Sequence, residues 1–259
     1  MRDVDATIGA LTEQPARTVL LLDFDGSLAP IVERADDARP LPAALTALAH
    51  LAPRLGRVGV VSGRPVGFLA EHVQVPGVTF AGLYGMEQLT DGVRTLDPRV
   101  VPYLDAVASA TAELAGRFPA EVVEPKSGVS VTLHWRPAPE LADEIRAAAD
   151  DLAHRYGLGL LRTRMAVELR PPVAIDKGDI TRELVAGFDV GAFVGDDTGD
   201  LPAFAALARA VAGGGLRRAV RIGVDSAEAP SELAASVDLL VDGPAALVAL
   251  LTRVADEIV

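Results

Sequence analysis

The sequence predicts an α/β fold interrupted by a smaller α+β unit, and three observations support this prediction. In the first third of the 259 residues, apolar runs of strand length such as 19–25 alternate with segments of helical periodicity such as 41–55. The last third repeats this alternation, which is typical of βαβ units and a mostly parallel sheet. The middle third instead contains segments such as 129–136 that alternate apolar and polar residues, which is typical of antiparallel strands. The expected architecture is a Rossmann-like three-layer core with an inserted α+β domain.

The core elements are expected in the following order. Continuous apolar runs indicate strands covered on both faces, and a proline suits the first turn of a helix. The first half of the core contains a strand over 19–25, a helix over 41–55, a strand over 57–63, a helix from Pro65 and a strand over 78–85. The second half contains a helix over 177–187, a strand over 192–196, a helix from about Asp200, strands over 219–224 and 237–241, and a helix from Pro244.

The inserted domain is expected over 98–171, which leaves 1–97 and 172–259 for the core. Its strands alternate strictly, as 129–136 shows: one side carries Val129, Val131, Leu133 and Trp135, the other Ser130, Thr132, His134 and Arg136. The segment 165–170 has the same pattern. Two helical segments, 99–117 and 139–156, are expected to cover the apolar face, so that two similar αββ halves share one antiparallel sheet.

Composition excludes several classes of protein. The chain has 36 acidic and 24 basic side chains, a net charge of −12, which disfavours nucleic acid and anionic membranes as partners. It has no cysteine, which excludes disulfides and thiolate metal sites. Neither a signal peptide nor an apolar run of the roughly 18 residues that a membrane span needs is recognisable. We therefore expect a cytoplasmic protein that acts on a small molecule. The sequence indicates no oligomeric state and is compatible with a monomer.

Carboxylates follow two of the predicted core strands. Asp23 and Asp25 end the run VLLLDFD, and Asp196 ends the strand in FVGD. The carboxyl ends of parallel strands form one sheet edge, where ligands bind and helix N-termini point. Converging carboxylates disfavour one another's charge unless a cation lies among them. We expect Mg²⁺ here, because it prefers oxygen ligands and uses few carboxylates together with water and phosphate oxygens.

Two other strand ends carry groups that suit a phosphate. In VVSGR, Ser62 offers its hydroxyl and neighbouring backbone N–H groups, and Arg64 adds a nearby cation. Lys177, in DKGD, begins a helix and can neutralise charge on a transferring phosphoryl group. An aspartate nucleophile that forms an aspartyl-phosphate is an established covalent route. The strand ends together therefore indicate phosphoryl transfer.

The segments DFDGS, VVSGR, DKGD and GDDTGD, in this order, resemble the four motifs of haloacid dehalogenase-superfamily phosphatases. One such segment alone is often only a turn or a helix cap, but four in order after predicted strands indicate catalysis. The resemblance implies that Asp23 attacks phosphorus and that Asp25 protonates the leaving oxygen and then activates water. It also implies that Ser62 and Lys177 hold the phosphoryl oxygens.

The same resemblance implies a metal site. Mg²⁺ would be bound by Asp23, by the backbone carbonyl of Asp25 and by Asp196. Asp200 would lie behind these ligands or steady the catalytic lysine. The place of the insert, between the second and third motifs, is similar to the superfamily's larger type of cap.

Further segments are similar to one family, the trehalose-6-phosphate phosphatases. These are DFDGSLAPI, VSGR, AGLYGMEQ, EPKSGVSVTLHWR, ELRPPVAIDKG and GDDTGDLPAF, which together span roughly 19–204. Three residues depart from the family pattern: Ser27 replaces Thr, Tyr84 replaces His and Gly199 replaces Thr. The resemblance implies Mg²⁺-dependent hydrolysis of trehalose 6-phosphate, a step of trehalose biosynthesis, through an aspartyl-phosphate.

The polar face of the inserted sheet is expected to close over the catalytic pocket. Strand alternation gives this face Thr132, His134, Arg136, Glu168 and Arg170, and the segment 121–128 adds Glu124 and Lys126. A disaccharide is rich in hydroxyls, so its lid should present polar groups. By resemblance, Glu124, Lys126 and Glu168 contact the sugar, and Arg64 of the core also binds the substrate.

Two other functions remain open. A capped phosphatase for another sugar phosphate, such as sucrose 6-phosphate, would carry the same core motifs and differ in the segments EPK and ELRP. A phosphosugar-binding regulator without turnover belongs to a different class, and it is disfavoured because no catalytic position is missing from the motifs.

Overall fold

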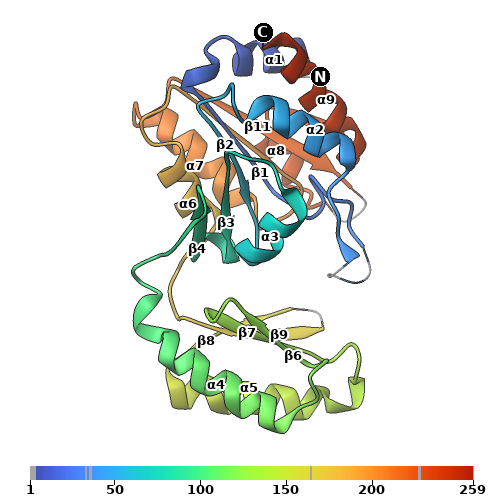
Figure 1. The fold of residues 1–259 in the computed structure, drawn as a ribbon, viewed down its shortest axis with the longest axis vertical. Coiled ribbons are helices and arrows are strands. Elements are labelled where there is room, and N and C mark those ends of the chain that lie inside the picture. The colour runs from blue at the N-terminus through green and yellow to red at the C-terminus, as the bar shows by residue number, and fades with distance from the viewer. Residues whose placement is uncertain (1–3, 33, 35–36, 164, 227–228, 259) are drawn as a thin grey trace. The chain divides into compact units, whose positions relative to one another are not determined.

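The computed structural model describes residues 4–32, 34, 37–163, 165–226 and 229–258. The chain divides into two compact units. Met1–Thr95 and Ile175–Val259 form the first, here called the core unit, and Leu96–Ala174 form the second, the insert unit. Figure 1 shows the helices and strands of each.

The core unit is built on an eight-stranded sheet. Its order is β12 (Leu239–Asp242), β11 (Arg218–Asp225), β10 (Val190–Gly195), β1 (Thr18–Leu22), β2 (Arg57–Val61), β3 (Val78–Gly82), β4 (Glu87–Thr90) and β5 (Val93–Leu96). The strands from β12 to β3 pair in parallel, and β4 pairs antiparallel with β3. The predicted parallel sheet is thus confirmed.

Helices cover both faces of this sheet. Their bounds are α1 Val4–Thr12, α2 Pro42–Leu51, α3 Val66–Val73, α6 Lys177–Leu184, α7 Leu201–Ala212, α8 Leu233–Ser236 and α9 Gly243–Glu257. Alternate residues of β1 point to opposite faces: Leu20 packs in a cluster with α1, α2, α3 and α9, and Leu21 in a cluster with α6, α7 and α8. All five residues of β1 are buried. This confirms the three-layer α/β core.

The insert unit is a four-stranded antiparallel sheet with two helices. The sheet order is β6 (Val123–Lys126), β7 (Ser130–His134), β9 (Ala166–Arg170) and β8 (Gly159–Arg162). The apolar residues of β7 and β9 share a core cluster with those of α4 (Leu104–Arg117) and α5 (Ala142–Tyr156). The chain order α4-β6-β7-α5-β8-β9 is the expected αββ repeat.

The opposite face of the insert sheet is less exposed than its alternation indicated. Ser130, Thr132 and Glu168 belong to the polar face that the alternation predicts, yet all three are buried. Lys126 on β6 bonds Glu168 on β9 at 3.4 Å, and β7 lies between these strands. The long lysine side chain therefore crosses β7, which lowers the exposure of the shorter side chains beneath it.

Several element ends also differ from the expected ones. The strand expected over 78–85 ends at Gly82, where the chain enters a 3₁₀ turn over Leu83–Gly85. The helix expected from 99 begins at Leu104, after a 3₁₀ turn over Val101–Tyr103 that contains a proline. Among the described residues, none of the helices has the length and apolar character needed to cross a lipid bilayer.

Candidate active site

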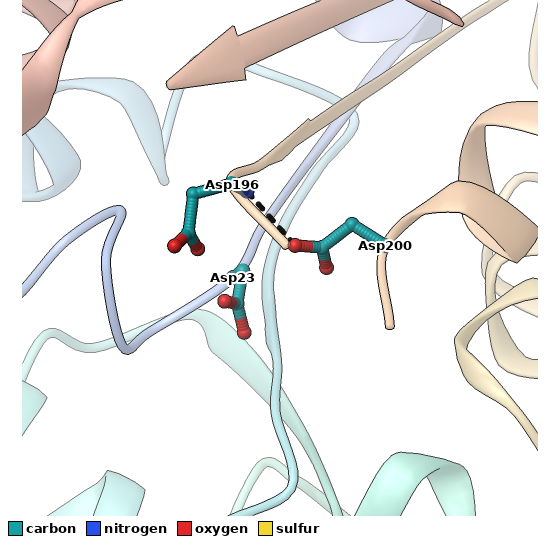
Figure 2. A group of neighbouring side chains, drawn as sticks. All are labelled: Asp23, Asp196 and Asp200. Atoms are coloured by element: carbon teal, nitrogen blue, oxygen red, sulfur yellow. Dashed lines mark hydrogen bonds between the residues drawn. The ribbon is translucent and has the colours of Figure 1, made fainter. Parts of the chain in front are cut away.

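Two neighbouring strands bring distant carboxylates together at one edge of the core sheet. β1 and β10 pair in parallel with Leu22 opposite Val194. The pairing continues past β1, because the backbone N–H of Asp23 donates to the carbonyl of Val194 at 2.9 Å. Asp196 follows β10 directly, so the two carboxylates lie side by side at the carboxyl edge although 173 positions separate them (Figure 2).

Lys177 joins this edge from the first position of α6. The N-cap Asp176 fixes the start of the helix by accepting hydrogen bonds from the N–H groups of Gly178 and Asp179. The ammonium of Lys177 then donates to Oδ1 of Asp23 at 2.6 Å and to Oδ1 of Asp200 at 2.7 Å. All three side chains are buried. The lysine therefore compensates part of the negative charge at this edge.

Asp200 precedes α7 and organises its neighbours rather than facing open space. Its Oδ2 accepts hydrogen bonds from the backbone N–H groups of Asp196 at 2.9 Å and Asp197 at 3.1 Å, and the first of these is dashed in Figure 2. Its other oxygen accepts from Lys177. Asp200 thus fixes the loop that carries Asp196 and orients the lysine.

The crowding of acids in a buried place changes their proton affinity. Burial raises the pKa of Asp23 well above its usual range, although Lys177 opposes this rise. Burial, with Asp200 and Asp197 nearby, raises the pKa of Asp196 to about 7. Burial lowers the pKa of Lys177, but Asp23 and Asp200 outweigh this and leave it above its usual value. The cluster therefore carries more acid than one ammonium neutralises.

The acidic cluster suits a hard cation. One carboxylate oxygen from each of Asp23, Asp196 and Asp200 lies within 4.8 Å of the others. Oδ1 of Asp196 is buried, and within the part of the chain that the structure describes it has no hydrogen-bond partner. A buried carboxylate oxygen without a donor is costly unless an ion occupies its lone pairs. The donors are all oxygens, which fits the predicted type of metal.

Asp25 and Arg64 form a second group at the same edge. The guanidinium of Arg64 donates to both oxygens of Asp25, each at 2.8 Å. The backbone N–H of Arg64 also donates to the hydroxyl of Ser62 at 3.2 Å, which ties the two residues of the VSGR segment together. The Asp25 side chain is thus engaged with Arg64 and lies outside the cluster of side-chain carboxylates. This is compatible with the expectation that Asp25 offers the ion only its backbone carbonyl.

The residues expected to contact the sugar lie on one sheet of the insert unit. Thr132 pairs with both Glu124 and Glu168, so these three side chains form one row across the sheet. The ammonium of Lys126 donates a hydrogen bond to Glu168, and the ring of His134 forms a hydrogen bond of 2.7 Å with the carboxylate of Glu124. Oε1 of Glu168 is buried and has no hydrogen-bond partner among the described residues. The roles of all these residues, and of those in the core, stay predictions.

The family model described as trehalose-phosphatase matches residues 21–238, which contain both groups of the core site and the whole insert. The chain belongs to this family. The resemblance inferred from the motifs is therefore confirmed.

Relatives of this trehalose-phosphatase family member differ from it in length. The chain is 31% identical over 229 residues to a trehalose-phosphate phosphatase of Mycobacterium leprae, a match that covers 82% of this chain and 53% of the relative. It is 36% identical over 205 residues to an uncharacterized glycosyl hydrolase of Mycobacterium tuberculosis, with 74% and 15% covered. The chain thus spans about half of the first relative and a small part of the second.

A solved structure shares the fold. The C-terminal domain of a Candida albicans trehalose-6-phosphate phosphatase superposes with a TM-score of 0.70 at 20% identity, and 98% of this chain and 97% of that chain are covered. At this identity the likeness concerns the fold. It includes both the parallel core and the inserted unit.

Two features of this family member's site were missed from the sequence. Phe68 lies under the Arg64 guanidinium, and the (i, i+4) spacing at a helix start was the signal that could have indicated it. The phenol of Tyr84 lies against Gly63, where a Cβ would be 2.8 Å from its Oη.

The scarcity of lysine was a further sequence signal for the site. Only two of the 24 basic residues are lysines, and both, Lys126 and Lys177, lie at predicted site positions.

Proposed function

We propose that the protein hydrolyses trehalose 6-phosphate to trehalose and inorganic phosphate through an aspartyl-phosphate on Asp23, with Mg²⁺ as cofactor. The observation that carries the proposal is the buried cluster in which Lys177 donates hydrogen bonds to Asp23 and Asp200. Beside them lies an Asp196 oxygen that has no partner among the described residues. The family match supports the substrate.

The first half of the reaction transfers the phosphoryl group to the enzyme. A carboxylate oxygen of Asp23 attacks phosphorus and forms an acyl-phosphate bond, while the bond from phosphorus to the sugar oxygen breaks. Asp25 gives its proton to the departing sugar oxygen. Lys177 favours the ionised form of Asp23 and orients its carboxylate, because its ammonium donates to Oδ1 at 2.6 Å. Ser62 and its neighbouring backbone N–H groups hold phosphoryl oxygens.

The second half regenerates the enzyme. A water molecule attacks phosphorus, Asp25 takes up one of its protons, and the acyl-phosphate bond breaks to release inorganic phosphate and free Asp23. Asp25 therefore ends the cycle with the proton that it gave away in the first half. For Asp25 to act first as general acid and then as general base, its carboxyl group must reach both the sugar oxygen and the water.

Asp23, the backbone carbonyl of Asp25 and Asp196 would hold Mg²⁺. When bound, the ion supplies positive charge that offsets the phosphoryl oxygens and the surrounding carboxylates. The buried oxygen of Asp196, which has no partner in the part of the chain that the structure describes, supports this assignment. So does the raised pKa of Asp196, to about 7, because it marks a carboxylate whose negative charge the protein alone does not compensate.

The insert unit selects the sugar, with Glu124, Lys126 and Glu168 as its contacts. Buried polar atoms without partners among the described residues support this proposal: Oγ of Ser130, Oγ1 of Thr132 and Oε1 of Glu168. A polyhydroxylated ligand supplies the donors and acceptors that such atoms need. A trehalosyl group has these in excess, and an apolar ligand has none.

Phosphate release from a panel of sugar phosphates tests the proposal. The panel holds trehalose 6-phosphate, sucrose 6-phosphate and glucose 6-phosphate, each with Mg²⁺ and with a chelator. We expect kcat/KM to be highest for trehalose 6-phosphate and turnover to vanish with the chelator. A clear preference for sucrose 6-phosphate would show that the proposed substrate is wrong. Full turnover in the presence of the chelator would refute the metal requirement.

A matched pair of variants separates catalysis from binding. Asp23→Asn removes the nucleophile, and Asp5→Asn makes the same chemical change at an exposed residue of α1 that pairs with Arg253. We expect turnover to vanish in the first variant and to stay unchanged in the second. Equal phosphate release by both would refute the role of Asp23. Absence of turnover in the wild-type protein, with trehalose 6-phosphate still bound, would indicate a phosphosugar-binding regulator.

A further inference from the structure

Arg64 is held at its side chain by two charged hydrogen bonds in parallel. Its Nε donates to Oδ2 of Asp25 and its Nη2 to Oδ1, both at 2.8 Å. A bidentate pair of this kind fixes the plane of the carboxylate as well as its distance. The orientation of Asp25 is therefore set by the orientation of the guanidinium.

The backbone of Arg64 is held from two sides as well. Its N–H donates to the Ser62 hydroxyl at 3.2 Å, and its carbonyl accepts from the N–H of Leu83 at 3.0 Å. Leu83 and Tyr84 both have a positive φ, 51° and 62°, which is rare for residues with a side chain. Such backbone conformations persist where the surroundings enforce them. Here they place the Leu83 N–H against the arginine loop.

Phe68, four residues after Arg64 and in the first turn of α3, forms a platform for the guanidinium. The Arg64 Cζ lies 4.7 Å from the centroid of the Phe68 ring, within the range of a cation–π contact. The ring is itself fixed on two sides. It stacks on His72 at 4.2 Å, and it meets Phe24 edge-to-face at 5.6 Å. Phe24 is fully buried between Asp23 and Asp25 in the chain.

We propose that Arg64 and Phe68 are positioning residues for Asp25. The proposal rests on the function proposed above, in which Asp25 transfers protons, and it assigns to Arg64 the orientation of Asp25 in place of the expected contact with the phosphate. The side chain of Asp25 is 39% exposed and that of Arg64 is 17% exposed, so the carboxylate is the more accessible member of the pair. Arg64 lies behind Asp25 and directs it, and Phe68 keeps the guanidinium in the plane that this requires.

The two tasks of Arg64 predict different kinetics. A contact with the phosphate is made by every phosphate ester, so its loss lowers kcat/KM equally for all of them. Misplacing the proton donor matters only where the leaving oxygen needs a proton. General-acid catalysis contributes about 10²–10⁴-fold for such leaving groups, and little for a nitrophenolate, which leaves as a stable anion.

The test measures kcat/KM for aryl phosphates of increasing leaving-group pKa and for trehalose 6-phosphate. This parameter covers the steps up to transfer to Asp23, so the later hydrolysis does not affect it. In Arg64→Lys and Phe68→Leu we expect a loss of about tenfold or more for alkyl and phenyl esters and a loss below about twofold for dinitrophenyl phosphate. The dependence on leaving-group pKa thus becomes steeper.

Phe188→Leu is the matched control, because Arg57 lies over the Phe188 ring at 5.2 Å in a comparable contact elsewhere in the core unit. It should leave the leaving-group dependence unchanged. If the Phe68→Leu variant fails to fold, the Arg64→Lys variant alone still tests the proposal. A uniform loss across the series would overturn the proposal and leave Arg64 as a phosphate contact, and no loss would overturn it too. Wild-type protein that cleaves aryl phosphates but not trehalose 6-phosphate would refute the proposed substrate alone.

Discussion

Gly26 follows Asp25 and lies directly against the carboxylate of Asp196. Its φ is +77°, and a Cβ at this position would lie 2.0 Å from Oδ2 of Asp196. A side chain here is therefore excluded twice, by the backbone conformation and by the neighbouring carboxylate. The absence of a side chain lets the DFDG turn approach the end of β10.

Gly26→Ala tests this contact. We expect the substitution to displace the Asp196 carboxylate, to weaken stabilisation by Mg²⁺ and to lower kcat by about tenfold or more, since small misplacements at a reacting centre are costly. The control is Gly92→Ala, whose glycine has the same φ of +77° but no atom of a described residue within 4 Å of the added Cβ. Both variants should lose about 1 kcal/mol of unfolding free energy from backbone strain, and only the first should lose activity. Equal activities would contradict the role of Gly26.

At the scale of strands, the row Glu124, Thr132 and Glu168 crosses the insert sheet. Glu168 is buried, with one oxygen bonded to Lys126 and the other unpartnered among the described residues. This arrangement leaves one buried oxygen of Glu168 able to accept a hydrogen bond. A carboxylate so placed suits a hydroxyl of the substrate, because a hydrogen bond to a charged acceptor is strong where water is excluded.

Glu168→Gln should lower kcat/KM for trehalose 6-phosphate by about tenfold or more, which corresponds to at least about 1.4 kcal/mol. Hydrolysis of p-nitrophenyl phosphate, which has no sugar, should stay within about twofold of wild type, since the core groups are unchanged. Glu144→Gln is the control. Glu144 is a half-exposed residue of α5 that pairs with Arg117. Equal losses of kcat/KM on both substrates would show that Glu168 stabilises the fold and does not recognise the sugar.

The strands that carry the candidate core site could be predicted from the sequence, and some connections could not. The run ending in Asp23 is apolar throughout because helices cover both of its faces, and that pattern is readable without partners. The β4–β5 hairpin was missed although Asp91 and Gly92, with φ of 50° and 77°, form the Asp–Gly pair that such turns prefer. Its strands alternate weakly and are half exposed, so periodicity alone did not reveal them.

Contacts between segments distant in sequence were the least predictable part. The strand-end motifs indicated which residues meet, but not which pairs form. That Arg64 bonds Asp25, and that Lys126 reaches across β7 to Glu168, depends on side-chain directions that no spacing encodes. The burial of Ser130 and Thr132 follows from the second contact, and it was therefore missed as well.

At the scale of the whole molecule, stability and metal binding are linked through the acidic cluster. Burial raises the pKa of Asp196 from 3.8 to about 7. Without metal, the folded protein therefore holds this proton more tightly than the unfolded chain. The stabilisation is complete below about pH 4 and is lost as the pH rises to about 7. A divalent cation replaces the proton, so its effect should grow over the same range.

Thermal unfolding at several pH values measures this linkage. We expect Mg²⁺ to raise the Tm more at about pH 8 than at about pH 6, because fewer protons compete with it at the higher pH. In the presence of a chelator, the Tm should fall as the pH rises through this interval. Asp196→Asn should reduce both effects. An increase in Tm by Mg²⁺ that is equal at both pH values would show that Asp196 does not exchange its proton for the ion.

The most direct measurement for the whole account is the site of phosphorylation during turnover. The protein is mixed with p-nitrophenyl phosphate and Mg²⁺ and quenched in acid within milliseconds, and its peptides are sequenced by mass spectrometry. Asp25→Asn serves as a parallel sample, since it slows the release of phosphate from the enzyme. We predict one phosphoryl group on Asp23 in both samples. A phosphoryl group on another residue, or none during full turnover, would contradict the account.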